Sequence, residues 1–376
     1  MKRKSVASVD NMHGSQTDEV VFLEALLRIP SRSGQEGAAA AFLVERMRGF
    51  GWQAFVDEAG NAVGLLGDDG PLVALLGHID TVPGEIAVRV EDGKLYGRGA
   101  VDAKGPFATF VEAARRAQLR GEHAGRPLRC RLALIGATEE EAASSKGAHY
   151  ARDRYAPALC VIGEPSGWER VTLGYKGSLV VHYRHEQPAA HSAGELRAAP
   201  EALVEFWRAV EARCAAHNAG RERSFEQLTP ALRRVASGGD GLTDWAEASV
   251  SLRLPEGVEP TALVEELRGL AGAATLRFEG GCPAFRSPRT TPLAGAFVRA
   301  IRAQGGQPTF LHKTGTADMN VVGPAWGCPI VAYGPGDARL DHTPNEHIEI
   351  EEYRRAIAVL ADVLGQLGAR AQIDAL

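Results

Sequence analysis

The stretch LVALLGHID, residues 72–80, opens with a short apolar run that closes on a glycine. Such a run is typical of a buried strand. Two similar runs occur at residues 128–136 and 158–163, and a helix is predicted over residues 104–119 after a glycine-rich turn. Strands that alternate with helices predict an α/β sheet that is covered on both faces.

The middle of the chain has a different pattern. Glycines and prolines between residues 217 and 245 indicate a loop. Around this loop, strands and helices are predicted in alternation, at residues 178–184, 198–216, 246–254, 260–270 and 274–278. This order predicts a small ferredoxin-like α+β unit. Because the α/β pattern returns near residue 286, the small unit is predicted to be inserted into the larger domain.

The predicted boundaries follow from this insertion. The larger domain comprises residues 18–173 and 284–376, and the inserted unit comprises residues 174–283. Residues 1–17 are polar and lack the apolar segment of a signal peptide, so a disordered tail is predicted. The length of 376 residues also favours two domains.

Composition and charge narrow the classes of function. The net charge of −5 disfavours a nucleic-acid partner, because phosphate neutralisation needs a basic face. The sequence lacks an apolar run of about 18 residues, so no membrane span is predicted. The five cysteines are far apart and form no CxxC pair, which predicts free thiols in a reducing cytoplasm rather than disulfides or a thiolate zinc site.

Polar residues follow the first predicted strand and the glycine-rich turn. His78 ends the strand, and Asp80 points the same way because residues i and i+2 share a face on extended backbone. An imidazole placed there can bind a metal while the carboxylate fixes its tautomer. In LYGRGAVDAKG, residues 95–105, glycines surround Asp102 and allow a close approach to a ligand. A phosphate-binding loop is disfavoured, because neither GxxxxGK[ST] nor GxGxxG is present.

Three adjacent carboxylates, Glu139, Glu140 and Glu141, follow the strand predicted at residues 128–136. They lie at a strand end, where α/β sheets place ligands. Carboxylates so close together repel one another unless a cation lies between them. One that is left off the metal can act as a base.

Two more candidate ligands lie in loops. Glu164 in GEPS follows another buried strand, and His342 in HTPNE precedes the last helix, predicted over residues 349–367. Imidazole and carboxylate ligands without thiolates suit zinc, manganese or cobalt. The sequence therefore predicts a metal site that is assembled from separate loops.

The motifs GHIDTVP, YGRGAVDAKG, TEEE, GEPS and HTPNE, in this order, resemble the signature series of the M20 metallopeptidase and amidohydrolase family. Succinyl-diaminopimelate desuccinylase and acetylornithine deacetylase belong to this family. The resemblance spans nearly the whole chain. It implies an amide hydrolase with two divalent metal ions per subunit, Zn²⁺ or alternatively Co²⁺, in a zinc-peptidase-like α/β catalytic domain. It also implies that the inserted unit is a lid through which a homodimer forms.

The family implies a role for each matching ligand position. Asp102 would bridge the two ions. The ligands of the first ion would be His78, Asp102 and Glu164, and those of the second would be His342, Asp102 and Glu141.

The family also implies catalytic groups. Asp80 would orient His78, and Glu140 would be the general base. The family usually reads Asp-Glu-Glu where this chain reads Glu-Glu-Glu, so a shift by one residue would make Glu139 the base and Glu140 the ligand. His191, in PAAHSAG, resembles the lid histidine that reaches into the partner subunit's site and stabilises the oxyanion.

GEPSGW, GYKGSLVV and HKTGTADMN resemble, more narrowly, the lysine/ornithine hydrolases of the amino-group carrier pathway. Those enzymes release lysine or ornithine from the γ-carboxyl of the C-terminal glutamate of a small acidic carrier protein. The resemblance implies this carrier as the partner. It implies a role in lysine biosynthesis through aminoadipate, and a second role in arginine biosynthesis if ornithine is also released.

Substrate contacts are predicted from polar residues near the last of these motifs and on the lid. Arg253 matches an arginine that contacts the substrate carboxylate in relatives, and a guanidinium fork suits a carboxylate. The asparagine that usually precedes it by about a dozen residues is missing from SGGDGLTDW. Residues that could hydrogen-bond the polar ends of an amino acid are Lys313, Thr314, Thr316 and Asn320.

Other functions stay open. An N-acetyl-lysine or N-acetylornithine deacetylase, an aminopeptidase or a dipeptidase would use the same chemistry. A conjugate-binding protein without turnover would lack a ligand or the base, and all are present. A carbohydrate hydrolase with paired carboxylates would keep its activity after chelation.

Overall fold

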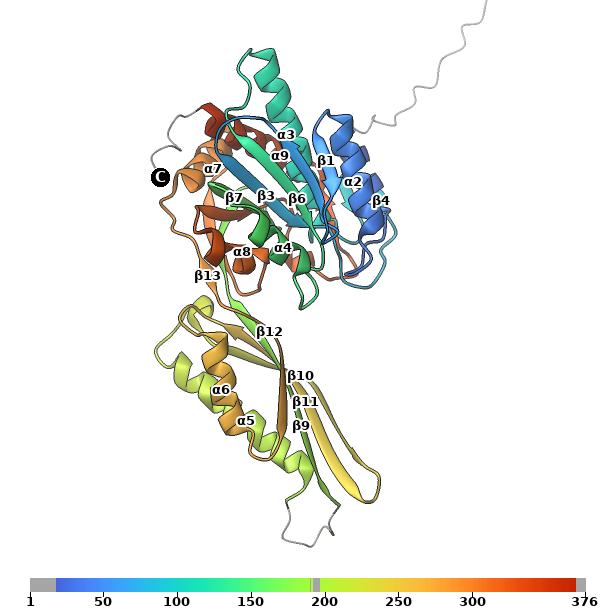
Figure 1. Cartoon of the computed structure of the whole chain (residues 1–376), viewed down its shortest axis with the longest axis vertical. Coiled ribbons are helices and arrows are strands. Elements are labelled where there is room, and N and C mark those ends of the chain that lie inside the picture. Colours follow the sequence, from blue (N-terminus) through green and yellow to red (C-terminus); the bar gives the residue numbers. More distant parts are fainter. Residues whose placement is uncertain (1–17, 190, 192–196, 370–376) are drawn as a thin grey trace, which may run out of the picture.

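The computed structural model describes residues 18–189, 191 and 197–369, and the tail predicted at residues 1–17 lies outside them. Within these residues the chain forms two bodies, one below the other along the longest axis (Figure 1). The larger body is built on a mixed nine-stranded sheet, and the smaller one on a four-stranded antiparallel sheet. This architecture confirms the predicted α/β domain with an inserted ferredoxin-like lid.

The centre of the large sheet consists of three parallel strands, β3 (Leu72–His78), β6 (Arg131–Ala137) and β7 (Leu159–Gly163). They are buried almost throughout, because helices cover both faces of the sheet, and this explains their continuous apolar sequences. Their carboxyl ends meet at one edge, so the residues that follow each strand are brought together.

Helices α3 (Lys104–His123) and α9 (Ile350–Ala369) pack together on one face of this sheet, and α4 (Lys146–Arg154) and α8 (Asp318–Trp326) pack together on the other. The remaining elements of the larger body are α1 (Asp18–Leu27), α2 (Gly37–Gly49), β1 (Gln53–Val56), β2 (Ala62–Leu66), β4 (Arg89–Glu91), β5 (Lys94–Tyr96), β8 (Arg170–Tyr175), β13 (Phe285–Arg286), α7 (Pro292–Ala303), β14 (Thr309–Lys313), β15 (Ile330–Tyr333) and β16 (His347–Glu349). No helix within the described ranges is both long and apolar enough to cross a membrane.

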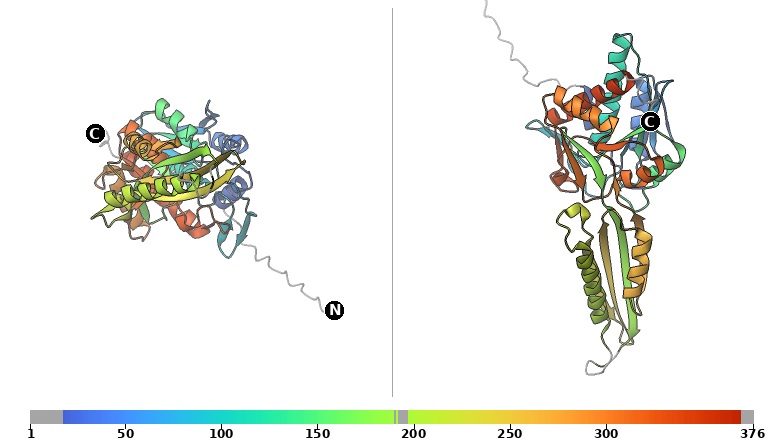
Figure 2. Two further views of the ribbon diagram at one scale, coloured as in Figure 1. Left: turned by 90° about the horizontal axis from the view of Figure 1, so that it is seen from below. Right: turned by 90° about the vertical axis from the view of Figure 1, so that its left-hand side faces the viewer.

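The smaller body is the lid, and its sheet order β10-β11-β9-β12 is that of a ferredoxin-like unit. Both lid helices pack on one face of this sheet, and α6 begins at a proline, as its sequence predicts. The elements are β9 (Gly177–Pro188), α5 (Ala199–Asn218), β10 (Thr229–Gly239), β11 (Thr243–Leu254), α6 (Pro260–Leu270) and β12 (Thr275–Cys282). The right-hand view of Figure 2 shows the lid projecting from one end of the larger body.

One prediction in the lid is wrong. The glycines and prolines between residues 217 and 245 indicate a loop, but residues 229–239 form the edge strand β10. Most of its side chains are exposed, so it lacks the apolar alternation of a half-buried strand. Antiparallel pairing with β11 along its whole length determines its conformation instead.

The chain crosses between the two bodies twice, after β8 and again after β12. One side chain of the larger body is hydrogen-bonded to both crossing segments. The amide nitrogen of Asn320 donates hydrogen bonds to the main-chain oxygens of Tyr175 (3.4 Å), Lys176 (3.3 Å) and Pro283 (2.9 Å). On the lid side, the ammonium of Lys176 donates to the main-chain oxygen of Ser224 at 3.2 Å. These bonds fix the lid opposite the carboxyl ends of the central strands.

Candidate metal centre

His78 is the last residue of β3, and its side chain is 1% exposed. Its Nδ1 lies 3.0 Å from the main-chain oxygen of Asp80 and 3.4 Å from the Asp80 carboxylate. Since both of these partners accept hydrogen bonds, Nδ1 carries the proton. Nε2 is therefore the ring nitrogen that would bind a metal, once the proton that it shares with a carboxylate is released.

The carboxylate of Asp80 is fully buried and holds the loop that carries the three glutamates. It accepts hydrogen bonds from the backbone N–H groups of Glu140 and Glu141, both at 3.1 Å, and from the hydroxyl of Ser33 at 2.7 Å. Burial raises the pKa of Asp80, but the bonds from His78 and Ser33 outweigh it and lower the pKa overall. Asp80 therefore remains an anion that positions both His78 and this loop.

Asp102 offers one carboxylate oxygen to each of two imidazoles. Its Oδ1 lies 3.0 Å from Nε2 of His78, and its Oδ2 lies 3.0 Å from Nε2 of His342. The same His342 nitrogen lies 2.8 Å from Oε1 of Glu141. A carboxylate placed between two histidines in this way can bridge two cations.

Glu164 completes the cluster from the end of β7. Its Oε1 lies 4.0 Å from Nε2 of His78. Ligand atoms of His78, Asp102 and Glu141 all lie within 4.8 Å of one another. The structure thus brings together the five predicted ligands, which are His78, Asp102, Glu141, Glu164 and His342.

The electrostatics of the cluster fit two divalent cations. Burial, and then the charge of Asp102, raise the pKa of Glu164 to about 8. Hydrogen bonds to Asp102 and Glu141 raise the pKa of His342 to about 10. In the protein alone, protons must therefore balance the buried carboxylates. Zn²⁺ and Co²⁺ accept this set of imidazole and carboxylate donors, and either ion would supply the positive charge that these protons provide.

The three adjacent glutamates have different surroundings. Glu139 has a φ of +58°, and its carboxylate accepts a hydrogen bond from the hydroxyl of Ser144 at 2.6 Å. It also lies 3.9 Å from the ammonium of Lys146. Glu140 is half-buried near the cluster, and desolvation together with the charges of nearby carboxylates raises its pKa well above its ordinary value. This geometry favours the register in which Glu140 is the base and Glu141 is the ligand.

The predicted substrate residues line a cleft of about 1280 Å³ between the lid and the larger body, which also contains Glu140 and His342. From the lid, the guanidinium of Arg253 donates to the hydroxyl of Thr316 at 2.9 Å. The ammonium of Lys313 donates to the main-chain oxygen of Pro165. Thr314 and Asn320 also line the cleft, but the Asn320 amide is already bonded to main-chain groups, including the N–H of Ala317 at 3.0 Å.

His191 does not join the cluster within this chain. It is exposed and follows β9, whose far end points away from the larger body (Figure 1). A role in the metal centre would therefore require a second subunit. This role stays a prediction.

Glu346 is a residue of the site that the sequence analysis missed. Its carboxylate is fully buried and accepts hydrogen bonds from the backbone N–H groups of Val101 (2.9 Å) and Asp102 (3.1 Å) and from the guanidinium of Arg98 (2.7 Å). It therefore ties the loop of His342 to the loop of Asp102. The only feature of the sequence that pointed to Glu346 was its position at the end of HTPNE. Because a glutamate in a loop is usually a solvated charge, this position alone does not predict a role in the site.

Glu346→Gln is expected to weaken the binding of Zn²⁺ to the metal-free protein by about 10–100-fold, as loss of a group that orients metal ligands usually does. The amide cannot accept from all three donors, so Asp102 loses part of its support. Competition with a chromophoric chelator measures the affinity. Glu352→Gln is the matched control, because Glu352 accepts a backbone N–H bond from Trp168 away from the cluster. Equal affinities in the two variants would show that Glu346 does not position Asp102.

Comparison with known proteins agrees with this geometry. The model of peptidase family M20/M25/M40 matches residues 74–366. A protein of Deinococcus radiodurans named [LysW]-lysine hydrolase is 49% identical over 346 residues, which cover 90% of this chain and 94% of that protein. A [LysW]-lysine/[LysW]-ornithine hydrolase of Saccharolobus islandicus is 24% identical over 280 residues, which cover 74% of this chain and 77% of that protein.

Solved structures show the same fold at low identity. An M20 family metallo-carboxypeptidase from Sulfolobus solfataricus superimposes with a TM-score of 0.78 at 18% identity, covering 94% of this chain and 100% of its own. A dinuclear metal-binding M20 peptidase from Bacillus subtilis gives a TM-score of 0.70 at 14% identity, covering 93% of this chain and 98% of its own. The chain belongs to peptidase family M20/M25/M40, as the order of its motifs predicts.

Proposed function

We propose that this chain is a metal-dependent amide hydrolase that releases L-lysine, and as a second product L-ornithine, from the γ-glutamyl C-terminus of an amino-group carrier protein. The hydrolase proposal rests on the contacts of Asp102 with His78 and His342, in a cluster beside a cleft that Glu140 also lines. The names of its relatives, [LysW]-lysine hydrolase and [LysW]-lysine/[LysW]-ornithine hydrolase, support the carrier conjugate as substrate.

Two divalent cations fit the cluster. Zn²⁺ is the proposed metal at both positions, and Co²⁺ is the alternative. His78 and Glu164 would hold one and His342 and Glu141 the other, with Asp102 shared. When bound, the cations supply Lewis acidity that polarises the amide carbonyl and activates water.

Glu140 is the proposed proton carrier. It takes a proton from water as the water oxygen bonds to the carbonyl carbon. It then gives that proton to the nitrogen as the carbon–nitrogen bond breaks, so the products are the carrier's free γ-carboxyl and the amino group of lysine. Burial raises the pKa of Glu140, which suits a group that must hold a proton between two steps.

The proposed substrate contacts line the same cleft as this base. The guanidinium of Arg253 suits the α-carboxylate of the departing lysine. Lys313, Thr314 and Thr316 are the further polar groups proposed to bind the polar ends of the amino acid. Asn320 would contribute indirectly, because it is hydrogen-bonded to the two segments that connect the lid to the larger body.

A homodimer is part of the proposal, because His191 can reach a metal centre only in a second subunit. There it would donate to the acyl oxygen, as the family resemblance implies. A cytoplasmic location and a place in lysine and arginine biosynthesis complete the proposal.

A product screen tests the substrate class. Metal-loaded protein is expected to release lysine from the purified carrier–lysine conjugate. Its kcat/KM for the conjugate should be at least about tenfold above that for acetyl-lysine, acetylornithine and dipeptides. Only the conjugate offers both the carrier and the lysine carboxylate as binding groups. Amino-acid analysis of the released product measures each rate. A preference for acetyl-lysine or acetylornithine would instead support the deacetylase alternative.

A further inference from the structure

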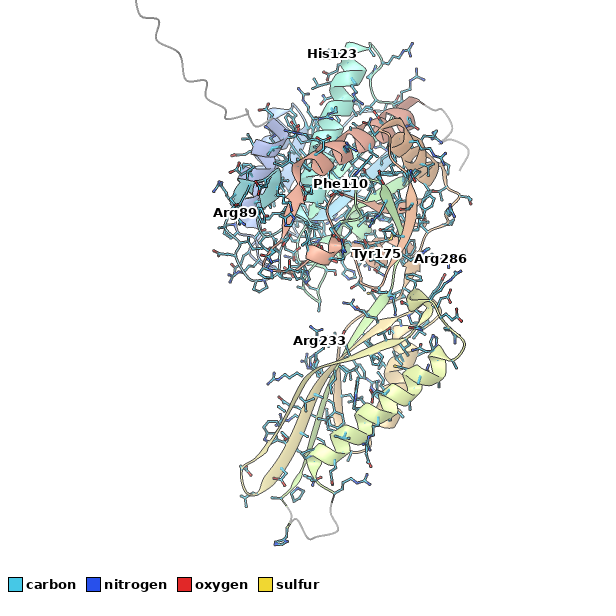
Figure 3. The ribbon with its side chains drawn as sticks, turned by 180° about the vertical axis from the view of Figure 1, so that it is seen from behind. Arg89, Phe110, His123, Tyr175, Arg233 and Arg286 are labelled. Carbon is cyan, nitrogen blue, oxygen red and sulfur yellow. The ribbon has the colours of Figure 1, made fainter. Side chains whose placement is uncertain are left out.

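Tyr175 lies at the end of β8, where the chain first leaves the larger body for the lid (Figure 3). It lines the cleft together with Asp102, Glu140 and Glu164, although the residue as a whole is only 1% exposed. Its hydroxyl is buried and, among the described residues, makes no hydrogen bond. A buried donor without a partner, on a residue that lines a site, indicates a group that is completed by the ligand.

The burial of this hydroxyl keeps it a donor. Burial is the largest cause that raises the pKa of the Tyr175 phenol well above its ordinary value. The phenol therefore carries its proton throughout the neutral range. Glu164 and Asp102 direct their oxygens to the histidines of the cluster, and Glu140 is the proposed base. Neither these carboxylates nor Asp341, whose charge also acts on the phenol, accepts a hydrogen bond from it. An oxygen of the substrate is therefore the acceptor proposed for the phenol.

The ring is held in place from several sides. The ammonium of Lys313 lies 5.7 Å from the ring centroid, which is within the range of a cation–π contact. The backbone of Tyr175 pairs with Phe285 of β13, and its main-chain oxygen accepts from the Asn320 amide at 3.4 Å. The hydroxyl is therefore preorganised, as a donor that acts in a transition state must be.

We infer that Tyr175 is a further catalytic residue, whose O–H donates a hydrogen bond to the acyl oxygen of the bound amide. As the water oxygen bonds to the carbonyl carbon, the carbonyl π pair moves onto the acyl oxygen. The hydrogen bond from Tyr175 strengthens with this charge, and the phenol keeps its proton. The acidic side chains around Tyr175 cannot do this as carboxylates, because they only accept hydrogen bonds. The inference rests on the proposed amide hydrolysis and adds a donor from the subunit's own larger body.

Tyr175→Phe tests the role, because it removes the hydroxyl and keeps the ring that packs against Lys313. We expect kcat to fall by about 10²–10³-fold, as for loss of one donor to a developing oxyanion. KM and the number of bound metal ions should stay close to those of the unchanged protein. Because the phenol does not titrate in this range, the pH profile of kcat should keep its shape.

Tyr333→Phe is the matched control. Tyr333 is also fully buried, but its hydroxyl donates to the main-chain oxygen of Trp168 at 2.9 Å and lies outside the cleft. This variant should keep kcat and lose only stability, which thermal unfolding of both variants measures.

Either of two results would overturn the inference: the Tyr175→Phe variant keeps the kcat of the wild-type protein, or it loses bound metal in proportion to its loss of activity. The wild-type protein is assayed beside it on the carrier–lysine conjugate and on acetyl-lysine. If only acetyl-lysine is cleaved, the proposed substrate is wrong, and the comparison of the two variants on that amide still decides the role of Tyr175.

Discussion

Glu140→Gln is expected to lower kcat by about 10²–10⁴-fold, the usual range for loss of a general base. The amide has the size of the carboxylate but cannot take a proton from water. Asp80 holds this position through the backbone N–H of Glu140, so the loop should keep its conformation. Steady-state kinetics on the carrier–lysine conjugate give kcat, and elemental analysis of the same samples gives the metal content, which should not change.

Glu139→Gln is the matched control for this prediction. Glu139 bonds to Ser144 and lies near Lys146 rather than in the cluster, so its loss should change kcat less than about twofold. Glu141→Gln should instead lower metal content, because Glu141 contacts His342. If Glu139→Gln abolished turnover and Glu140→Gln lost metal, the register would be shifted by one residue.

Removal of the metals is expected to abolish activity and to have the largest effect of all. Dialysis against a chelator should reduce turnover to background, and addition of Zn²⁺ or Co²⁺ should restore it. The cluster without cations must hold protons on its buried carboxylates, and a protonated site cannot activate water. The assay is turnover before chelation, after it and after each metal is added back. Activity that survives chelation would instead favour a mechanism with paired carboxylates alone.

The same cluster predicts how the affinity for metal depends on pH. In the metal-free protein, hydrogen bonds to Asp102 and Glu141 raise the pKa of His342 to about 10, so this imidazole is protonated at neutral pH. A cation must displace that proton. The affinity is therefore expected to rise with pH, by up to about tenfold per pH unit for each proton released. Metal titration of the metal-free protein at two pH values one unit apart measures this slope, and a flat response would show that His342 is not a ligand.

Much of the fold can be predicted from local pattern. The strands β3, β6 and β7 are short apolar runs closed by turn residues, and helices such as α3 and α6 have clear periodicity. Strand β10 could not be predicted in this way. Its exposed residues have no core face to mark them, and its strand conformation comes from pairing with β11.

Part of the site can also be predicted from the order of strands and polar residues along the chain. His78 ends β3, the three glutamates follow β6, and Glu164 follows β7. Because neighbouring parallel strands end at the same edge, residues in these positions converge in any α/β sheet with this strand order. The sequence alone therefore determined the chemistry of the ligands and the edge at which these residues would gather.

Only the tertiary structure decided how His342 and Tyr175 reach that edge. Strand β16 follows HTPNE and pairs with β5, which precedes the glycine-rich turn, and buried Glu346 joins the same two loops. Tyr175 reaches the cleft because the chain crosses to the lid at that point. Contacts between segments so far apart in the chain leave no periodic pattern, since the pairing energy that creates them exists only after the sheet has folded.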